Sequence, residues 1–131
     1  MFPSIFTDEL SKDITEAAPV IRSWGLGHVD LRGKVFGGDI EFVPPERLGE
    51  LRKLLDGHEL KVGCLQTSLA KVHLPDATRR QAEQAKLEGI IRAADALDCR
   101  LARVFFYWQP RDDSRGRLAE LPGQMDACLE M

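Results

Sequence analysis

The sequence predicts an α/β fold in which short β-strands and longer α-helices alternate along one domain of 131 residues. Apolar runs recur at intervals of about 30–40 residues, the length of a βαβ repeat. Each run is followed by a segment whose apolar residues repeat at helical spacing. This order implies parallel strands joined by right-handed crossovers. With 44% hydrophobic residues, the chain can form one core without disulfide or metal staples.

The first unit is an expected strand at residues 2–6 and a helix capped by Ser11 or Asp13. Pro19 lies within the helical pattern, so we expect a bend or a late helix start there. The buried face of this helix is predicted from residues at i, i+3, i+4 and i+7: Ile14, Ala17, Ala18 and Ile21.

The second unit begins with an expected strand at residues 28–32. Val29 and Leu31 face one side of it, and a polar set faces the other: His28, Asp30 and Arg32. A long loop over residues 33–43 then leads to a helix opened by Pro45 and ended at Asp56-Gly57.

The third and fourth units are an expected strand at 61–67, a loop at 68–76, a helix capped by Asp76 that runs to about residue 97, and a strand at 101–107. Residues 109–131 form a weakly patterned tail, in which Pro122 and Gly123 interrupt a last helix expected between 118 and 129. We treat residues 1–131 as a single domain.

Two architectures compete for this order of elements. A small doubly wound sheet has helices on both faces, and its strands read as continuous apolar runs. The second and third strands here alternate instead, with polar residues on one face, as in the lining of a closed barrel. A complete (β/α)₈ barrel takes about 250 residues, so we predict that the chain forms half of a TIM barrel.

Composition excludes several classes of function. Charged residues make up 30% of the chain and balance to a net charge of -3, without the basic stripe that nucleic-acid binding requires. No run of about 18 apolar residues predicts a membrane span, and the N-terminus has no signal-peptide pattern. The cysteine count is odd and has no metal or redox spacing, which favours a cytoplasmic location: Cys64, Cys99 and Cys128.

Three segments carry a family resemblance: residues 25–32, with Gly25 and Gly27 before Asp30, residues 46–66, and residues 90–105. Together they resemble the xylose isomerase-like superfamily of TIM barrels, which includes the sugar phosphate isomerase/epimerase family and AP-endonuclease-like proteins. The likeness covers residues 1–108, which correspond to the N-terminal half of that barrel.

The resemblance implies a carbohydrate-metabolism enzyme, a sugar isomerase or epimerase in which a divalent metal and carboxylates move a proton next to a sugar carbonyl. The family's metal ligands typically lie on strands five to eight, so no residue here is assigned to a metal. Its endonuclease branch has histidines where this chain has Gln66 and Tyr107. We therefore expect a protein that is incomplete or inactive as this chain alone. The alternatives are a non-catalytic binding or assembly module and a shortened reading frame.

Candidate residues for binding a sugar or sugar phosphate stand on polar strand faces, toward the end at which barrels place active sites: Asp30, Arg32, Gln66, Arg103 and Tyr107. The competing interpretation is structural. Asp30 would form an internal ion pair with Arg32 or Arg103, and Gln66 with Ser68 would cap a loop.

Other side chains have weaker claims to a role in binding. His73 stands in the loop after the third strand, where a loop histidine is more often a surface residue than a ligand. Four aromatic residues could stack on a sugar, although helix packing explains Trp24 better: Trp24, Phe36, Phe42 and Trp108.

Half a barrel also leaves two open sheet edges and an uncovered inner face, expected to include Val62, Cys64 and either Val104 or Phe105. Open edges and large apolar patches favour association with other chains. We therefore expect a homo-oligomer that forms through the barrel edges.

Overall fold

The computed structural model describes residues 2–72 and 77–105. Alternating strands and helices are confirmed over this part of the chain. The elements, in chain order, are β1 (Ile5–Phe6), α1 (Thr7–Leu10), α2 (Ile14–Ser23), β2 (His28–Leu31), the 3₁₀ turn η1 (Ile40–Phe42), α3 (Pro45–Gly57), β3 (Lys61–Gln66), α4 (Ala77–Leu97) and β4 (Ala102–Arg103).

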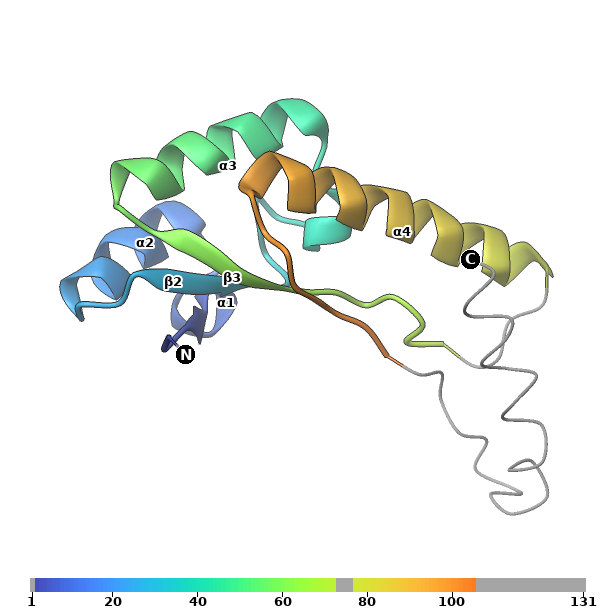
Figure 1. Ribbon diagram of the computed structural model, residues 1–131, viewed down its shortest axis with the longest axis horizontal. Helices are drawn as coiled ribbons and strands as arrows, with labels where there is room; N and C mark the ends of the chain where they lie inside the picture. Colours follow the sequence, from blue (N-terminus) through green and yellow to red (C-terminus); the bar gives the residue numbers. More distant parts are fainter. Residues whose placement is uncertain (1, 73–76, 106–131) are drawn as a thin grey trace, which may run out of the picture.

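The four strands form one sheet in the order β1-β2-β3-β4, and every neighbouring pair is parallel. Figure 1 shows α3 and α4 together on one side of these strands. A doubly wound sheet reverses its strand order at a switch point and has helices on both faces. Strands that follow chain order, with the long helices on one side, form an arc of a (β/α)₈ barrel.

The two faces of β2 differ as its alternation predicts. Val29 and Leu31 are fully buried on the helix side, whereas His28 and Asp30 are only half-buried. The pairing of β2 with β3 shifts register between Val29 and Asp30, which brings Asp30 opposite Cys64. One expectation for β3 is wrong: Val62 packs against the helix-covered core and is not part of the uncovered face.

Local sequence explains where the helices begin. The Asp13 side chain caps α2 by accepting a hydrogen bond from the Thr15 backbone N–H at 2.8 Å. Because α2 begins at Ile14, Pro19 lies within it and the late start is excluded. Pro45 occupies the first turn of α3, where a missing N–H removes no hydrogen bond.

Two predicted boundaries differ from the structure. The expected first strand at 2–6 is limited to β1, and Thr7–Leu10 is a short helix that the sequence pattern did not predict. The expected strand at 101–107 is described to residue 105, and within that part only Ala102–Arg103 pairs with β3. In the described part of the chain, no helix has both the length and the hydropathy needed to cross a bilayer.

The backbones of α4 and η1 approach each other closely at Gly89. A Cβ atom built on Gly89 would fall on the carbonyl oxygen of Glu41, so α4 can approach η1 only because residue 89 has no side chain. Figure 1 shows η1 as a short turn beneath α4. This contact holds the loop between β2 and α3 against the helix that follows β3.

We predict that Gly89→Ala destabilises the protein by about 1–3 kcal/mol, the usual cost of overpacking. The measurement is the free energy of unfolding in urea. The matched control is Gly49→Ala in α3, where an added Cβ meets no heavy atom within 4 Å. Removing a helical glycine there stabilises the fold by about 0.5–1 kcal/mol. Equal effects of the two substitutions would contradict the close contact.

Candidate ligand-binding site

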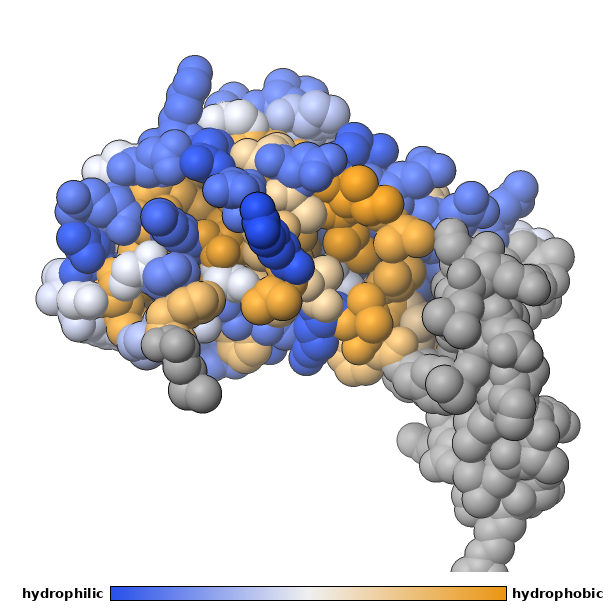
Figure 2. Space-filling view, viewed as in Figure 1, coloured by the Kyte–Doolittle hydropathy of each residue, from blue (hydrophilic) through white to orange (hydrophobic). Residues whose placement is uncertain are grey.

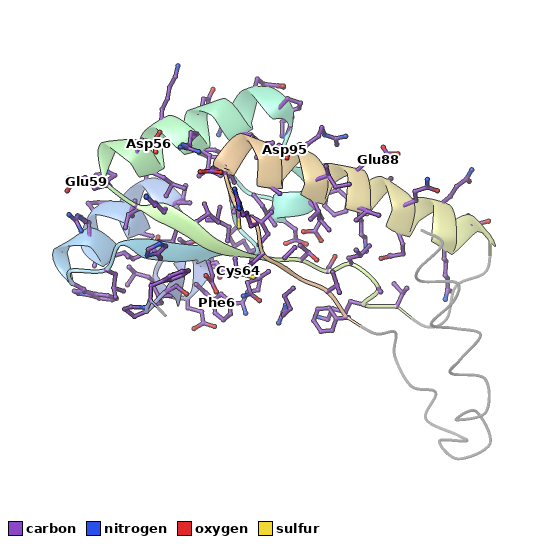
Figure 3. All side chains as sticks on the ribbon, viewed as in Figure 1. Phe6, Asp56, Glu59, Cys64, Glu88 and Asp95 are labelled. Atoms are coloured by element: carbon purple, nitrogen blue, oxygen red, sulfur yellow. The ribbon has the colours of Figure 1, made fainter. Side chains whose placement is uncertain are left out.

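A cavity of about 240 Å³ lies at the carboxyl ends of the four strands. Its walls come from the last residues of β3 and β4 and from the segments that follow the four strands: Asp8, Arg32, Gly33, Lys34, Asp39, Glu41, Gln66, Thr67, Ser68, Lys71, Arg103 and Phe105. Figure 3 shows Phe6 and Cys64 on the side of the strands away from α3 and α4. Barrel enzymes place their active sites at the carboxyl ends of their strands, where this cavity lies.

Three of the predicted site residues line this cavity: Arg32, Gln66 and Arg103. Asp30 lies behind them, and its Oδ2 accepts a hydrogen bond from Gln66 Nε2 at 3.0 Å. The expected ion pair of Asp30 with Arg32 or Arg103 is absent from residues 2–72 and 77–105. Asp30 therefore orients the Gln66 amide group. Tyr107 lies outside the described residues.

Arg32 forms ion pairs with two acidic residues of the first unit, Asp8 and Glu9. Its Nε donates to Asp8 Oδ2 at 3.0 Å, and its Nη2 lies 3.4 Å from Glu9 Oε1. The guanidinium group also lies over the Phe6 ring, 4.6 Å from its centroid. The hydrogen bond to Asp8 is the main cause that raises the pKa of Arg32. Arg32 therefore ties the end of β2 to α1.

Sequence reasoning missed Glu41, whose side chain is buried to 2% exposure in the loop after β2. Glu41 Oε1 accepts hydrogen bonds from the Ser68 hydroxyl and from the Ser68 backbone N–H, the latter at 2.9 Å. Glu41 Oε2 is sealed from solvent and has no partner among the described residues. A carboxylate from the second unit thus shapes the loop that follows β3.

Glu83 on α4 has a similar role and is also 2% exposed. Its Oε2 accepts from the Ala70 backbone N–H at 2.7 Å, while Oε1 lies 2.8 Å from Lys86 Nζ. Ala70 has a left-handed φ of 58°, which this bond helps to hold. The sequence offered a signal for Glu83, since it precedes Leu87 by four residues and so falls on the buried helical face.

At the β4 side of the cavity, the Arg103 guanidinium lies 4.6 Å from the Phe105 ring centroid, and Lys71 Nζ lies 5.4 Å from it. Arg103 and Phe105 both line the cavity. Arg103 is exposed, and the described part of the chain offers it no carboxylate partner.

The other aromatic and histidine candidates are dispersed. Trp24 is 54% exposed at the end of α2, so the helix-packing explanation for it is wrong. Phe42 is 61% exposed, and Phe36 lies under the Arg47 guanidinium at 3.9 Å. Neither of these two rings lines the cavity. His73 and Trp108 lie outside the described residues.

A metal does not fit the described residues. Residues 2–72 and 77–105 contain no group of three or more histidine, cysteine, aspartate or glutamate side chains able to hold one. His28 instead stacks on Phe2 at a centroid distance of 3.8 Å. Figure 3 shows several carboxylates on α3 and α4, and none of them lines the cavity: Asp56, Glu88 and Asp95.

Comparison with known proteins supports the fold class and nothing narrower. No protein-family model matches the sequence, and no curated protein matches it. Among solved structures, the chain is similar to part of a TIM-barrel enzyme. That structure is a crystal structure of D-psicose 3-epimerase in the presence of D-fructose, with a TM-score of 0.67 and 16% sequence identity. The match covers 96% of this chain and 46% of the epimerase, so the chain spans under half of that enzyme's length.

Cys64, half-buried beside Asp30, provides a probe of this face. Burial is the larger cause that raises the pKa of the Cys64 thiol, and the negative charge of Asp30 raises it further. We predict that alkylation of Cys64 has a pH midpoint above the ordinary thiol value of about 8.5, because the thiolate is the reactive form. Peptide mass spectrometry separates its adduct from those of the other cysteines.

Asp30→Asn should lower that midpoint, since it removes the negative charge but keeps the size of the side chain. Asp98→Asn, on the exposed turn after α4, is the control and should leave it unchanged. A midpoint at or below that of a free thiol, or one insensitive to Asp30→Asn, would contradict this description of the site.

Proposed function

We propose that this chain provides the sugar-binding first half of an isomerase- or epimerase-like (β/α)₈ barrel. The observation that carries the proposal is the polar cavity at the carboxyl ends of four successive parallel strands. The similarity to D-psicose 3-epimerase supports the barrel arc, and the sequence resemblance supplies the reaction class. Barrel enzymes bind their substrates at the carboxyl ends of their strands, where this cavity lies.

Gln66 is the proposed contact for a sugar hydroxyl. Asp30 accepts from Gln66 Nε2, which fixes the amide group and leaves Gln66 Oε1 as a hydrogen-bond acceptor at the cavity wall. Ser68 lies next to it, with its hydroxyl proton directed to Glu41 and its oxygen lone pairs still able to accept. A polyol, which presents several hydroxyl donors, matches this set of acceptors.

Proton transfer next to a sugar carbonyl needs more than this half supplies. The resemblance implies a divalent metal, but residues 2–72 and 77–105 contain no group that fits one. We therefore assign binding and orientation of the sugar to these residues, and no catalytic step. In this proposal the chain alone does not turn over sugar, and catalysis requires ligands from a second half barrel.

The second part of the proposal is that the chain self-associates. Self-association would also suit the alternative function, a non-catalytic assembly module. Within the described residues, β1 pairs only with β2, and β4 only with β3. Large apolar side chains stand exposed on either side of β4 and on α4: Leu101 at 60%, Val104 at 55% and Ile91 at 52%. Figure 2 shows apolar surface gathered on this face below α4. An edge of this kind pairs readily with another strand.

The sugar-binding proposal predicts that D-fructose or D-psicose binds in a calorimetric titration. Gln66→Ala should weaken this binding about five- to tenfold, the effect of one lost hydrogen bond. Gln81→Ala on the exposed side of α4 is the control and should leave it unchanged. Absence of binding to the unsubstituted protein at millimolar sugar, or an unchanged affinity of Gln66→Ala, would refute the proposal.

The assembly proposal predicts a dimer or larger species in sedimentation velocity at micromolar concentration. Leu101→Lys combined with Val104→Lys should shift the protein toward monomer, because lysine on an edge strand opposes pairing. The control is Val20→Lys on α2, a residue that is 39% exposed and lies away from β4. An unsubstituted protein that sediments as a monomer throughout would exclude self-association.

A further inference from the structure

Two cations at the β3 and β4 side of the cavity have no carboxylate partner among residues 2–72 and 77–105: Lys71 and Arg103. Arg32, by contrast, is bound to Asp8 and Glu9. Both groups are exposed, so a ligand in the cavity can reach them.

Phe105 brings these two cations together. The Arg103 guanidinium carbon lies 4.6 Å from the centroid of the Phe105 ring, and Lys71 Nζ lies 5.4 Å from it. Cations are attracted to an aromatic ring, but two of them beside one ring also repel each other. An anion bound at this side of the cavity reduces this repulsion and is attracted by both cations.

The backbone on the β4 side of this cluster is fixed before any ligand arrives. The Arg103 carbonyl oxygen accepts from Thr67 Oγ1 at 2.7 Å and from the Thr67 backbone N–H at 3.3 Å. The Phe105 N–H donates to the Leu69 carbonyl oxygen at 2.9 Å. A preorganised site loses less conformational entropy when a ligand binds.

The Lys71 side is held in the same way. The Lys71 N–H donates to the Ser68 carbonyl oxygen at 3.0 Å. The preceding residue, Ala70, is held by buried Glu83, and Ser68 by buried Glu41. Two buried carboxylates therefore fix the short loop that carries Lys71.

Charge is distributed unequally along the cavity. Its carboxylates all come from the segments after β1 and β2: Asp8, Asp39 and Glu41. Asp8 is paired with Arg32, and the free oxygen of Glu41 is sealed from solvent. The β1 and β2 segments also contribute Arg32 and Lys34, whereas the β3 and β4 segments line the cavity with two cations and no carboxylate, which makes theirs the more electropositive end.

We infer that Lys71, Arg103 and Phe105 form an oxyanion subsite, which takes the phosphate or carboxylate group of a sugar ligand whose hydroxyl groups reach Gln66. Arginine binds such groups through two parallel hydrogen bonds, and lysine adds a point charge. This inference rests on the proposed function, because it names the substrate class of the same cavity. It distinguishes an anionic ligand from the neutral D-fructose named for the epimerase structure.

Calorimetric titrations with four probes test the subsite: inorganic phosphate, D-fructose, D-fructose 6-phosphate and D-glucuronate. We expect D-fructose 6-phosphate or D-glucuronate to bind about tenfold more tightly than D-fructose, the difference that one charged contact makes. The phosphate ester and the sugar acid show which anion is preferred. Arg103→Gln and Lys71→Gln should each remove most of this preference and leave the D-fructose affinity unchanged.

Arg100→Gln is the matched control, since it makes the same change of charge at an exposed residue that does not line the cavity. Equal loss of phosphate binding in Arg100→Gln and Arg103→Gln would refute the subsite. It would also be refuted if D-fructose bound as tightly as both anionic probes. In the latter case the proposed sugar function would stand. If phosphate binds through Arg103 but no sugar binds, the subsite stands and the proposed function fails.

Discussion

The arrangement of the cavity depends on the contact between the backbones of Gly89 and Glu41. Helix α4 can approach η1 at this point because residue 89 lacks a side chain. The contact fixes the loop between β2 and α3 and places the Glu41 carboxylate at the end of β3. From there Glu41 holds Ser68, whose neighbours carry the β3 side of the cavity. A helix-packing constraint outside the barrel thus sets the geometry of a cavity at the strand ends.

Two buried acidic residues, Glu41 and Glu83, serve the same purpose in this region. Burying a carboxylate is costly unless hydrogen bonds or a cation compensate for lost hydration. Here each carboxylate accepts a backbone N–H of the loop after β3, and Glu83 also has Lys86 as a cationic partner. Leu69 anchors this short loop in the core, and the two carboxylates fix the backbone of the residues on either side of it, Ser68 and Ala70. Side chains on that loop can then face a ligand in one arrangement.

The sequence predicted the features that depend on local periodicity. Alternation in β2 revealed the faces of Val29 and Asp30, Pro45 marked the first turn of α3, and Asp13 was one of two proposed caps for α2. It did not predict the partners of the charged groups, because those contacts join segments far apart in the chain. Arg32 binds Asp8, 24 residues earlier, and Gln66 binds Asp30, 36 residues earlier. The periodicity of apolar residues and their secondary-structure propensity predict toward which face a side chain points. They do not predict which of several oppositely charged residues it binds.

The strand order has a consequence for how the domain is assembled during synthesis. Each strand pairs with the one made just before it, so every unit adds to the margin of the structure already present. Each of these pairings is parallel and spans a helical crossover, and parallel sheets fold more slowly than structures rich in local contacts. A ribosome delivers the N-terminal segments first, and they can dock in the order in which they emerge. Within the described residues the outer edge of β4 has no pairing strand, so it is the edge at which a further strand could add to the sheet.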